Sequence, residues 1–168
     1  IEYSNLNFFG GATTKGDGVN YGFNLNTGSN LGRKGFLNLT VDFGNQKSTN
    51  RAASPGTDPI FGGFSGNSIF KDWITNNPKL GMNIGQPNIT SGSVLYNLAV
   101  PVGDQGFEFY SFGGINYRHG VSYAVYRTPY WIADQFFNLH EKDAPNNGFL
   151  PNIGTDIQDI TFVAGGRG

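Results

Sequence analysis

The stretch VNYGFNLNTGSNLGRKGFLNLTVDF, residues 19–43, decides the predicted fold. Apolar and polar residues alternate on both sides of the segment Gly32-Arg33-Lys34-Gly35. A period of two places alternate side chains on opposite faces, which predicts two β-strands. Two glycines that bracket two polar residues predict a tight turn at 32–35, because glycine reaches positive φ without a steric penalty. The stretch is therefore a predicted β-hairpin.

The same arrangement recurs later in the chain, where a second glycine-bracketed turn at 103–106 joins two further alternating runs. Weaker alternation at both ends of the chain predicts one more strand on each side. The fold class that we expect is all-β, antiparallel and up-and-down. The six predicted strands cover about 1–13, 18–31, 35–47, 92–102, 106–119 and a segment that begins near 157.

The connections between these strands differ greatly in length. Two long connections, about 48–91 and 120–156, contain proline and glycine breakers and no sustained period. Such loops are unusual inside a compact soluble domain. Short turns that alternate with long loops are typical of transmembrane β-barrels, with the short turns on the periplasmic side and the long loops outside. We therefore expect turns 32–35 and 103–106 to be periplasmic and both long loops to be extracellular.

Charged residues are confined to one side of the predicted strands. The apolar positions of segments 19–25, 37–43, 94–102 and 107–117 include no Asp, Glu, Lys or Arg. A face in contact with lipid must lack charged side chains, since Arg or Lys at the bilayer midplane of a barrel costs about 2–4 kcal/mol. The opposite positions are expected to face the lumen, and they include Asn20, Asn24, Asp42, Glu108 and Arg118.

Composition excludes several other classes of protein. Glycine is frequent at 26 residues, and charged residues make up only 14% of the chain, below the quarter that is usual in soluble domains. With a net charge of −1 the chain has no general electrostatic basis for binding nucleic acid. Cysteine is absent, so neither disulfides nor thiolate metal sites can form. No apolar run approaches the 18 residues of a transmembrane helix.

No grouping of residues predicts catalysis. A Ser/His/Asp grouping, a phosphate-binding glycine loop and a Cys/His cluster are all missing, so we expect no enzyme activity, no cofactor and no metal site. The two histidines, His119 and His140, are placed in loops without partner ligands at metal spacing. Asp156 and Asp159 precede the last strand, where a solvated loop end is favoured over a calcium site.

One segment of the second long loop is the best candidate for ligand contact. It combines aromatic rings with an arginine, residue types that give a large contact area and cation–π recognition. The alternative, which we favour, is an aromatic belt at the outer lipid interface or packing within the loop. The candidate residues are Tyr126, Arg127, Tyr130 and Trp131.

Segments 96–103, 109–118, 148–151 and 163–168, together with the first hairpin, resemble the barrel of TonB-dependent outer-membrane receptors. The resemblance implies a 22-stranded barrel, closed by a plug domain, that crosses the outer membrane of a Gram-negative bacterium many times. Such receptors take up a siderophore, haem, a vitamin, a glycan or a peptide. Energy comes from the TonB–ExbB–ExbD complex, and a surface lipoprotein is a further candidate partner. The 168 residues would then be an excerpt of about six strands, without the plug.

Two alternatives stay open at this point. A passive porin, or a structural barrel subunit of an envelope complex, would show the same strands around a different lumen. A soluble, secreted, carbohydrate-binding β-sandwich would bury the apolar positions against a second sheet and shows the same alternation. It accounts less well for strands of about 12–14 residues, since strands in globular proteins usually have five or six.

Overall fold

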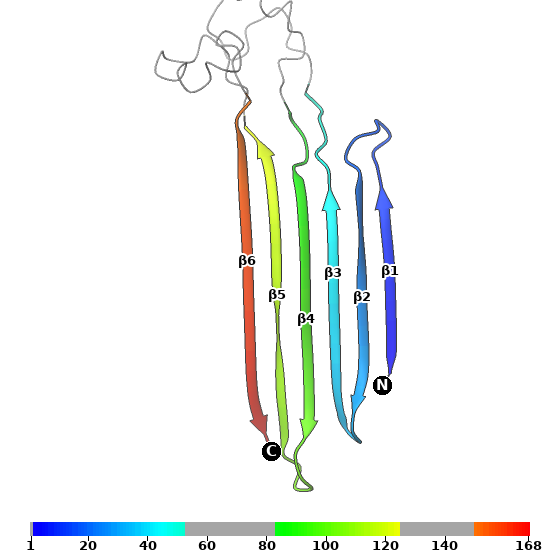
Figure 1. Ribbon diagram of the computed structural model, residues 1–168, viewed down its shortest axis with the longest axis vertical. Helices are drawn as coiled ribbons and strands as arrows, with labels where there is room; N and C mark the ends of the chain where they lie inside the picture. Colours follow the sequence, from blue (N-terminus) through cyan, green and yellow to red (C-terminus); the bar gives the residue numbers. More distant parts are fainter. Residues whose placement is uncertain (1, 53–82, 125–149) are drawn as a thin grey trace, which may run out of the picture. The chain divides into compact units, whose positions relative to one another are not determined.

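The computed structural model describes residues 2–52, 83–124 and 150–168. These residues form one sheet of six antiparallel strands, in which the order in space is the order in sequence (Figure 1). The predicted all-β, antiparallel, up-and-down arrangement is confirmed. The strands are β1 (Tyr3–Gly11), β2 (Asn20–Leu31), β3 (Gly35–Gln46), β4 (Asn88–Pro101), β5 (Glu108–Tyr123) and β6 (Asn152–Arg167).

Two short turns join β2 to β3 and β4 to β5 at the same end of the sheet, here called the turn end (Figure 1). Gly32 has φ 67°, and Gly103 and Gly106 have φ 72° and 83°. These values lie in the left-handed region that only glycine enters without strain. Leu31 pairs with Gly35 across the first turn, so the chain reverses there over three residues, Gly32, Arg33 and Lys34, one more than the two-residue hairpin loop.

The strands next to the long connections are longer than the sequence pattern predicts. β4 begins at Asn88 instead of 92, β5 continues past 119 to Tyr123, and β6 begins at Asn152 instead of 157. Serine, threonine, glycine and asparagine in these extensions carry no apolar period. Cross-strand pairing, such as that of Asn45 with Thr90, determines their extended state instead.

The chain has two compact units. The first, here called the strand body, comprises residues 1–48, 87–121 and 154–168, and the second comprises residues 49–86 and 122–153. Within the second unit the described residues also pair in extended fashion. The Thr49 amide donates to the Gln86 carbonyl at 3.1 Å, and the Arg51 amide donates to the Ile84 carbonyl at 2.6 Å. Likewise, the Ala124 amide donates to the Pro151 carbonyl at 2.9 Å. The first and last described residues of each long connection are thus joined by backbone hydrogen bonds.

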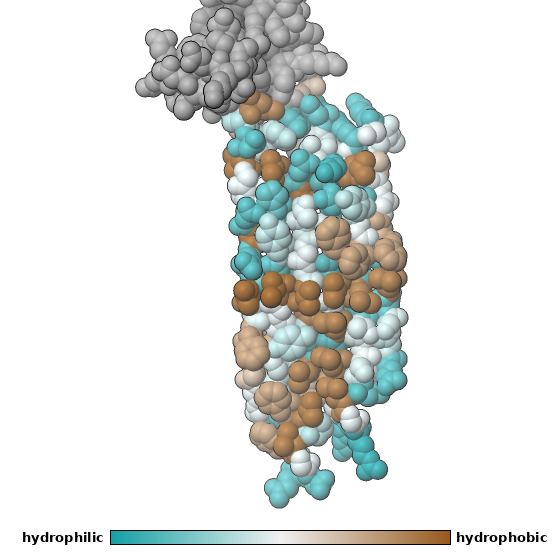
Figure 2. Space-filling view, viewed as in Figure 1, coloured by the Kyte–Doolittle hydropathy of each residue, from teal (hydrophilic) through white to brown (hydrophobic). Residues whose placement is uncertain are grey.

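The register gives the sheet two faces of different chemistry. Leu25 pairs with Val41, Val41 with Val94 and Val94 with Ile115, which aligns four aliphatic side chains in one row. We call their side of the sheet the apolar face. The other side, the polar face, carries the row Asn24, Asp42, Ser93 and Asn116. Figure 2 shows the apolar face, with hydrophobic side chains gathered in a row across the strands.

The described part of the chain has almost no hydrophobic core. Ala99 is the one hydrophobic residue that is buried there, with 3% of its surface exposed. A single layer of strands leaves both faces uncovered, so large apolar side chains remain accessible. Those on the apolar face that are exposed include Leu6, Phe8, Tyr21, Val94, Phe109, Ile115, Tyr117, Ile160 and Phe162.

The sheet is open. Among the described strands, β1 pairs only with β2 and β6 lies at the other end of the strand order, so each leaves one edge without a partner strand. Within the same residues, no helix is long and apolar enough to cross a membrane.

Candidate functional site: the polar face of the sheet

The polar face carries all five residues that the alternation assigned to one side of the strands. Asn24 lies opposite Asp42, and Asn20 lies opposite Gln46. Arg118 and Glu108 lie on the same face of β5, paired with Ser91 and Pro101 of β4. The alternation was therefore sufficient to group them on one face. The register brings only Asn24 and Asp42 into direct contact.

Asp42 is the centre of the hydrogen bonding on this face. The Asn24 side-chain amide donates to Asp42 Oδ1 at 2.5 Å, and the Ser93 hydroxyl donates to Asp42 Oδ2 at 3.0 Å. β3 lies between the strands that supply these donors, so both oxygens of the carboxylate are occupied from the two sides. Such charge-assisted bonds hold the side chain in one orientation along the surface of the sheet.

A hollow of about 290 Å³ lies beside Asp42. Its walls include Ser93, Asn116, Arg118 and Asp159. Arg118 and Asp159 line the same hollow, yet neither makes a hydrogen bond or ion pair with any other residue in the described ranges. Both charges are therefore available to a ligand or to a further segment of protein. With two carboxylates, one guanidinium and neutral polar groups, the hollow can bind a ligand of mixed charge.

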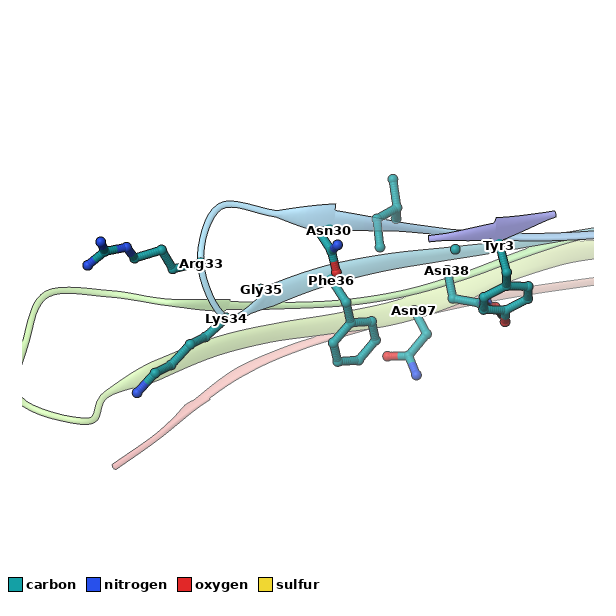
Figure 3. A pocket seen from close by; sticks show the side chains of 10 residues that line it. Tyr3, Asn30, Arg33, Lys34, Gly35, Phe36, Asn38 and Asn97 are labelled. Carbon is teal, nitrogen blue, oxygen red and sulfur yellow. Dashed lines mark hydrogen bonds between the residues drawn. The ribbon is translucent and has the colours of Figure 1, made fainter. Parts of the chain in front are cut away.

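A larger hollow, of about 630 Å³, lies on the same face nearer the turn end. Tyr3, Phe36, Asn38 and Asn97 contribute to its walls, and Figure 3 shows their side chains on the same side of the strands. The Asn38 side-chain amide donates to the Tyr3 hydroxyl at 2.5 Å. Amide groups beside aromatic rings can bind hydrogen-bonding ligands or polypeptide without requiring charge. Arg33 and Lys34, at the hairpin tip, also line the hollow.

Glu108 differs from the other predicted lumen residues because it has a cationic partner. The Arg167 guanidinium donates to Glu108 through Nε at 2.8 Å and also through Nη2. Its carbon Cζ lies 5.7 Å from the ring centre of Tyr110, which adds a cation–π contact. The ion pair joins β5 to β6 near the turn end. We therefore expect Glu108 to stabilise the strand pairing more than to contact a ligand.

The placement of His119 in a loop was wrong. His119 belongs to β5, and its Nδ1 lies 2.8 Å from Asp156 Oδ1 of β6. The Tyr117 hydroxyl donates to the same oxygen at 2.8 Å. Because Tyr117 and His119 share the face that carries Ile115, this polar cluster lies on the apolar face, at the end away from the short turns. Extended pairing with β6, rather than local sequence, determines this position.

The placement of Asp156 and Asp159 at a loop end was also wrong, since both belong to β6. Three positions apart in a strand, they lie on opposite faces and cannot bind one cation together. Over the described ranges, no three or more His, Cys, Asp or Glu side chains are grouped as a metal site would require.

The predicted ligand-contact residues Tyr126, Arg127, Tyr130 and Trp131 lie outside the described residues, as does His140. Sequence reasoning named Asp42, Arg118 and Asp159 of the smaller hollow, but it did not single out Tyr3 or Asn38 of the larger one. Alternation along β6 and β1 assigns them to a face, but only the register places Asp159 near Arg118 and Tyr3 near Asn38.

Comparisons with protein-family models, with curated proteins and with solved structures give no match to this chain.

Proposed function

We propose that this sheet is part of the wall of a transmembrane β-barrel in the outer membrane of a Gram-negative bacterium. We propose further that the barrel imports a scarce nutrient with energy from TonB. The observation that carries the proposal is the difference between the two faces. In the row through Val41 the apolar face is entirely aliphatic, whereas the neighbouring row of the polar face carries Asp42 and amides. Lipid would solvate the first face and water in a lumen the second.

The exposed apolar face is poorly suited to water. Monomeric soluble proteins rarely expose a continuous apolar patch beyond a few hundred Å². Here the row through Val94 and Ile115 continues into Leu6, with 47%, 48% and 52% of their surfaces exposed. In the described part of the chain no second sheet covers this row, which favours the barrel over the soluble sandwich.

Two hydroxyls of the apolar face are paired with each other, as hydrocarbon would require. The hydroxyls of Tyr96 and Ser111 lie 2.8 Å apart. Ser111 in turn donates to the Val163 carbonyl at 2.8 Å, and only 4% of its surface is exposed. An unpaired hydroxyl in the bilayer core would cost several kcal/mol, on the order of the cost of burying an unsatisfied polar group. This pairing supports contact of the face with acyl chains.

Two further observations support a barrel larger than six strands. The open edges at β1 and β6 would recruit other strands, and closure into a barrel removes such edges. Both short turns lie at one end of the sheet, whereas the long connections after β3 and β5 begin at the other. Outer-membrane barrels of at least eight strands have this asymmetry of turns and loops. The resemblance stated above supports 22 strands and TonB-dependent import in particular.

Fractionation of intact bacteria that express the full gene tests the barrel. We expect the protein in the outer-membrane fraction, with a gel mobility that changes only after boiling in detergent. Recovery in the aqueous fraction without detergent would support the sandwich and overturn the proposal.

Uptake assays test the transport function. A deletion strain and its complemented parent would be supplied with labelled ferric siderophores, haem, cobalamin, glycans and peptides. We expect one class of cargo to enter only when both the gene and TonB are present. Entry that needs the gene but not TonB would identify a passive porin instead.

A further inference from the structure

The apolar face ends in a polar row on the side of the long connections, which we call the headgroup row: Asn45, Thr90, His119 and Asp156. Asn45 pairs with Thr90 and Thr90 with His119, and His119 contacts Asp156. We propose that this row lies at the height of the lipid headgroups in the outer leaflet, so that hydrocarbon ends there. This inference rests on the proposed barrel wall and adds its position in the bilayer.

The change from apolar to polar side chains occurs over two rows. The row through Val41 and Ile115 is aliphatic, and the next row on the same face contains Phe43 and Tyr117. One row further on, Asn45 donates to the Thr90 hydroxyl at 2.7 Å. A boundary this abrupt matches the change from acyl chains to headgroups in a bilayer.

Tyr117 is oriented as an interfacial aromatic residue would be. Its hydroxyl donates to Asp156 at 2.8 Å, so the polar tip of the side chain is directed to the headgroup row. Its ring stays on the apolar face with 45% of the residue exposed. Tyr21, directly opposite Asn45, places a second exposed ring one row further out, in line with the headgroup row itself. Tyrosines with an apolar body and a wet tip concentrate at membrane interfaces.

The polar groups of the row would be costly at greater depth. The side chain of Asp156 is 65% exposed and carries a carboxylate. Charge on the lipid face of a barrel becomes tolerable only near the interfaces, where its cost falls to about 0–1 kcal/mol. Asn45 Oδ1 is buried without a hydrogen-bond donor, a condition that costs less beside hydrated headgroups than in hydrocarbon. The exposed Asp156 carboxylate therefore offers an acceptor to headgroups that carry N–H or O–H donors.

The length of the apolar band agrees with this position. Phe107, which is 45% exposed and directly precedes β5 near the turn end, and Tyr117 of β5 are ten positions apart in the chain. At about 3.4 Å per residue, ten positions extend about 34 Å along the strand. A tilt of about 35–45° reduces this to about 24–28 Å along the membrane normal, close to the roughly 25 Å apolar band of barrels.

Single-cysteine spin labelling tests the inference, with any cysteine outside these 168 residues replaced beforehand, since the 168 residues themselves contain none. The full-length protein would be reconstituted in vesicles of phosphatidylethanolamine and phosphatidylglycerol, with Ile115→Cys, His119→Cys or Asn116→Cys labelled in turn. Collisions with oxygen, which dissolves in hydrocarbon, would be compared with collisions with a water-soluble nickel chelate. We expect the ratio of oxygen to nickel collisions to be several-fold higher at 115 than at 119, and lowest at 116 on the polar face.

Val94→Cys and Thr90→Cys repeat the comparison without removing His119, which keeps the test valid should His119→Cys fail to fold. Equal ratios at 90, 94, 115 and 119, with 116 still low, would overturn the headgroup row but leave the barrel wall intact. Equal ratios at 115 and 116 would overturn the barrel wall as well.

Discussion

The ring of Phe9 lies over Gly22, its direct partner on the neighbouring strand, such that a Cβ on Gly22 would lie 2.5 Å from the ring atom Cζ. The same Cβ would also meet the backbone carbonyl of Phe43. Glycine at this position therefore allows an aromatic ring to lie flat on the polar face. The same arrangement recurs where Tyr3 lies over Gly28 and Tyr110 over Gly165.

Replacing Gly22 by alanine is expected to lower the free energy of unfolding by about 1–3 kcal/mol, the usual cost of overpacking. The backbone carbonyl cannot move aside as a flexible side chain would. Urea unfolding of the full-length protein in vesicles measures the change. Gly154→Ala is the matched control, since a Cβ there meets nothing within 4 Å. Equal stability of the two variants would contradict the prediction.

Asp42→Ala is expected to destabilise the protein by about 1–3 kcal/mol, because the Asn24 and Ser93 donors lose a charged acceptor. Asp159→Ala removes a carboxylate from the same hollow that has no hydrogen-bond partner in the described ranges. The free energy of unfolding of this variant should stay within about 0.5 kcal/mol of that of the parent protein, as is usual for surface substitutions. The same unfolding assay distinguishes them, and a larger loss at Asp159 would show that the network through Asp42 is unimportant.

An arginine at Ile115 should oppose insertion far more than an arginine at Asn116. The two positions are adjacent in β5 and lie on opposite faces. Ile115 lies between the midplane and the outer edge of the apolar band, so the guanidinium there costs less than the about 2–4 kcal/mol of the midplane, whereas on the polar face it stays in water. Folding yield into vesicles and the free energy of unfolding measure the difference. Equal penalties at both positions would mean that the two faces meet the same solvent.

Tyr96 and Ser111 should be energetically coupled. A double-mutant cycle with Tyr96→Phe and Ser111→Ala isolates their hydroxyl contact of 2.8 Å from the separate bond of Ser111 to Val163. We expect a coupling of about 0.6–1.7 kcal/mol in lipid, the range measured for hydrogen bonds between membrane segments. Additive effects of the two substitutions would show that the hydroxyls do not stabilise each other.

Much of the fold followed from alternation, since a period of two assigns each side chain to a face without knowledge of its neighbours. Asn24, Asp42 and Arg118 were grouped in this way, and the register agrees. His119 and Asp156 were misplaced because each is a polar residue at an apolar-face position, where it interrupts the alternation. Their strand state depends on pairing between segments that are far apart in sequence.

By itself, the sequence determined the strand class, the two glycine turns and the chemistry of each face, because turn geometry and side-chain alternation are local properties of the backbone. Only the tertiary structure decided which residues meet across strands: the Asn24–Asp42–Ser93 hydrogen bonds, the hollow near Arg118 and Asp159, and the His119–Asp156 contact. Register is the physical reason. A shift of one residue between strands would preserve every local pattern and replace every one of these contacts.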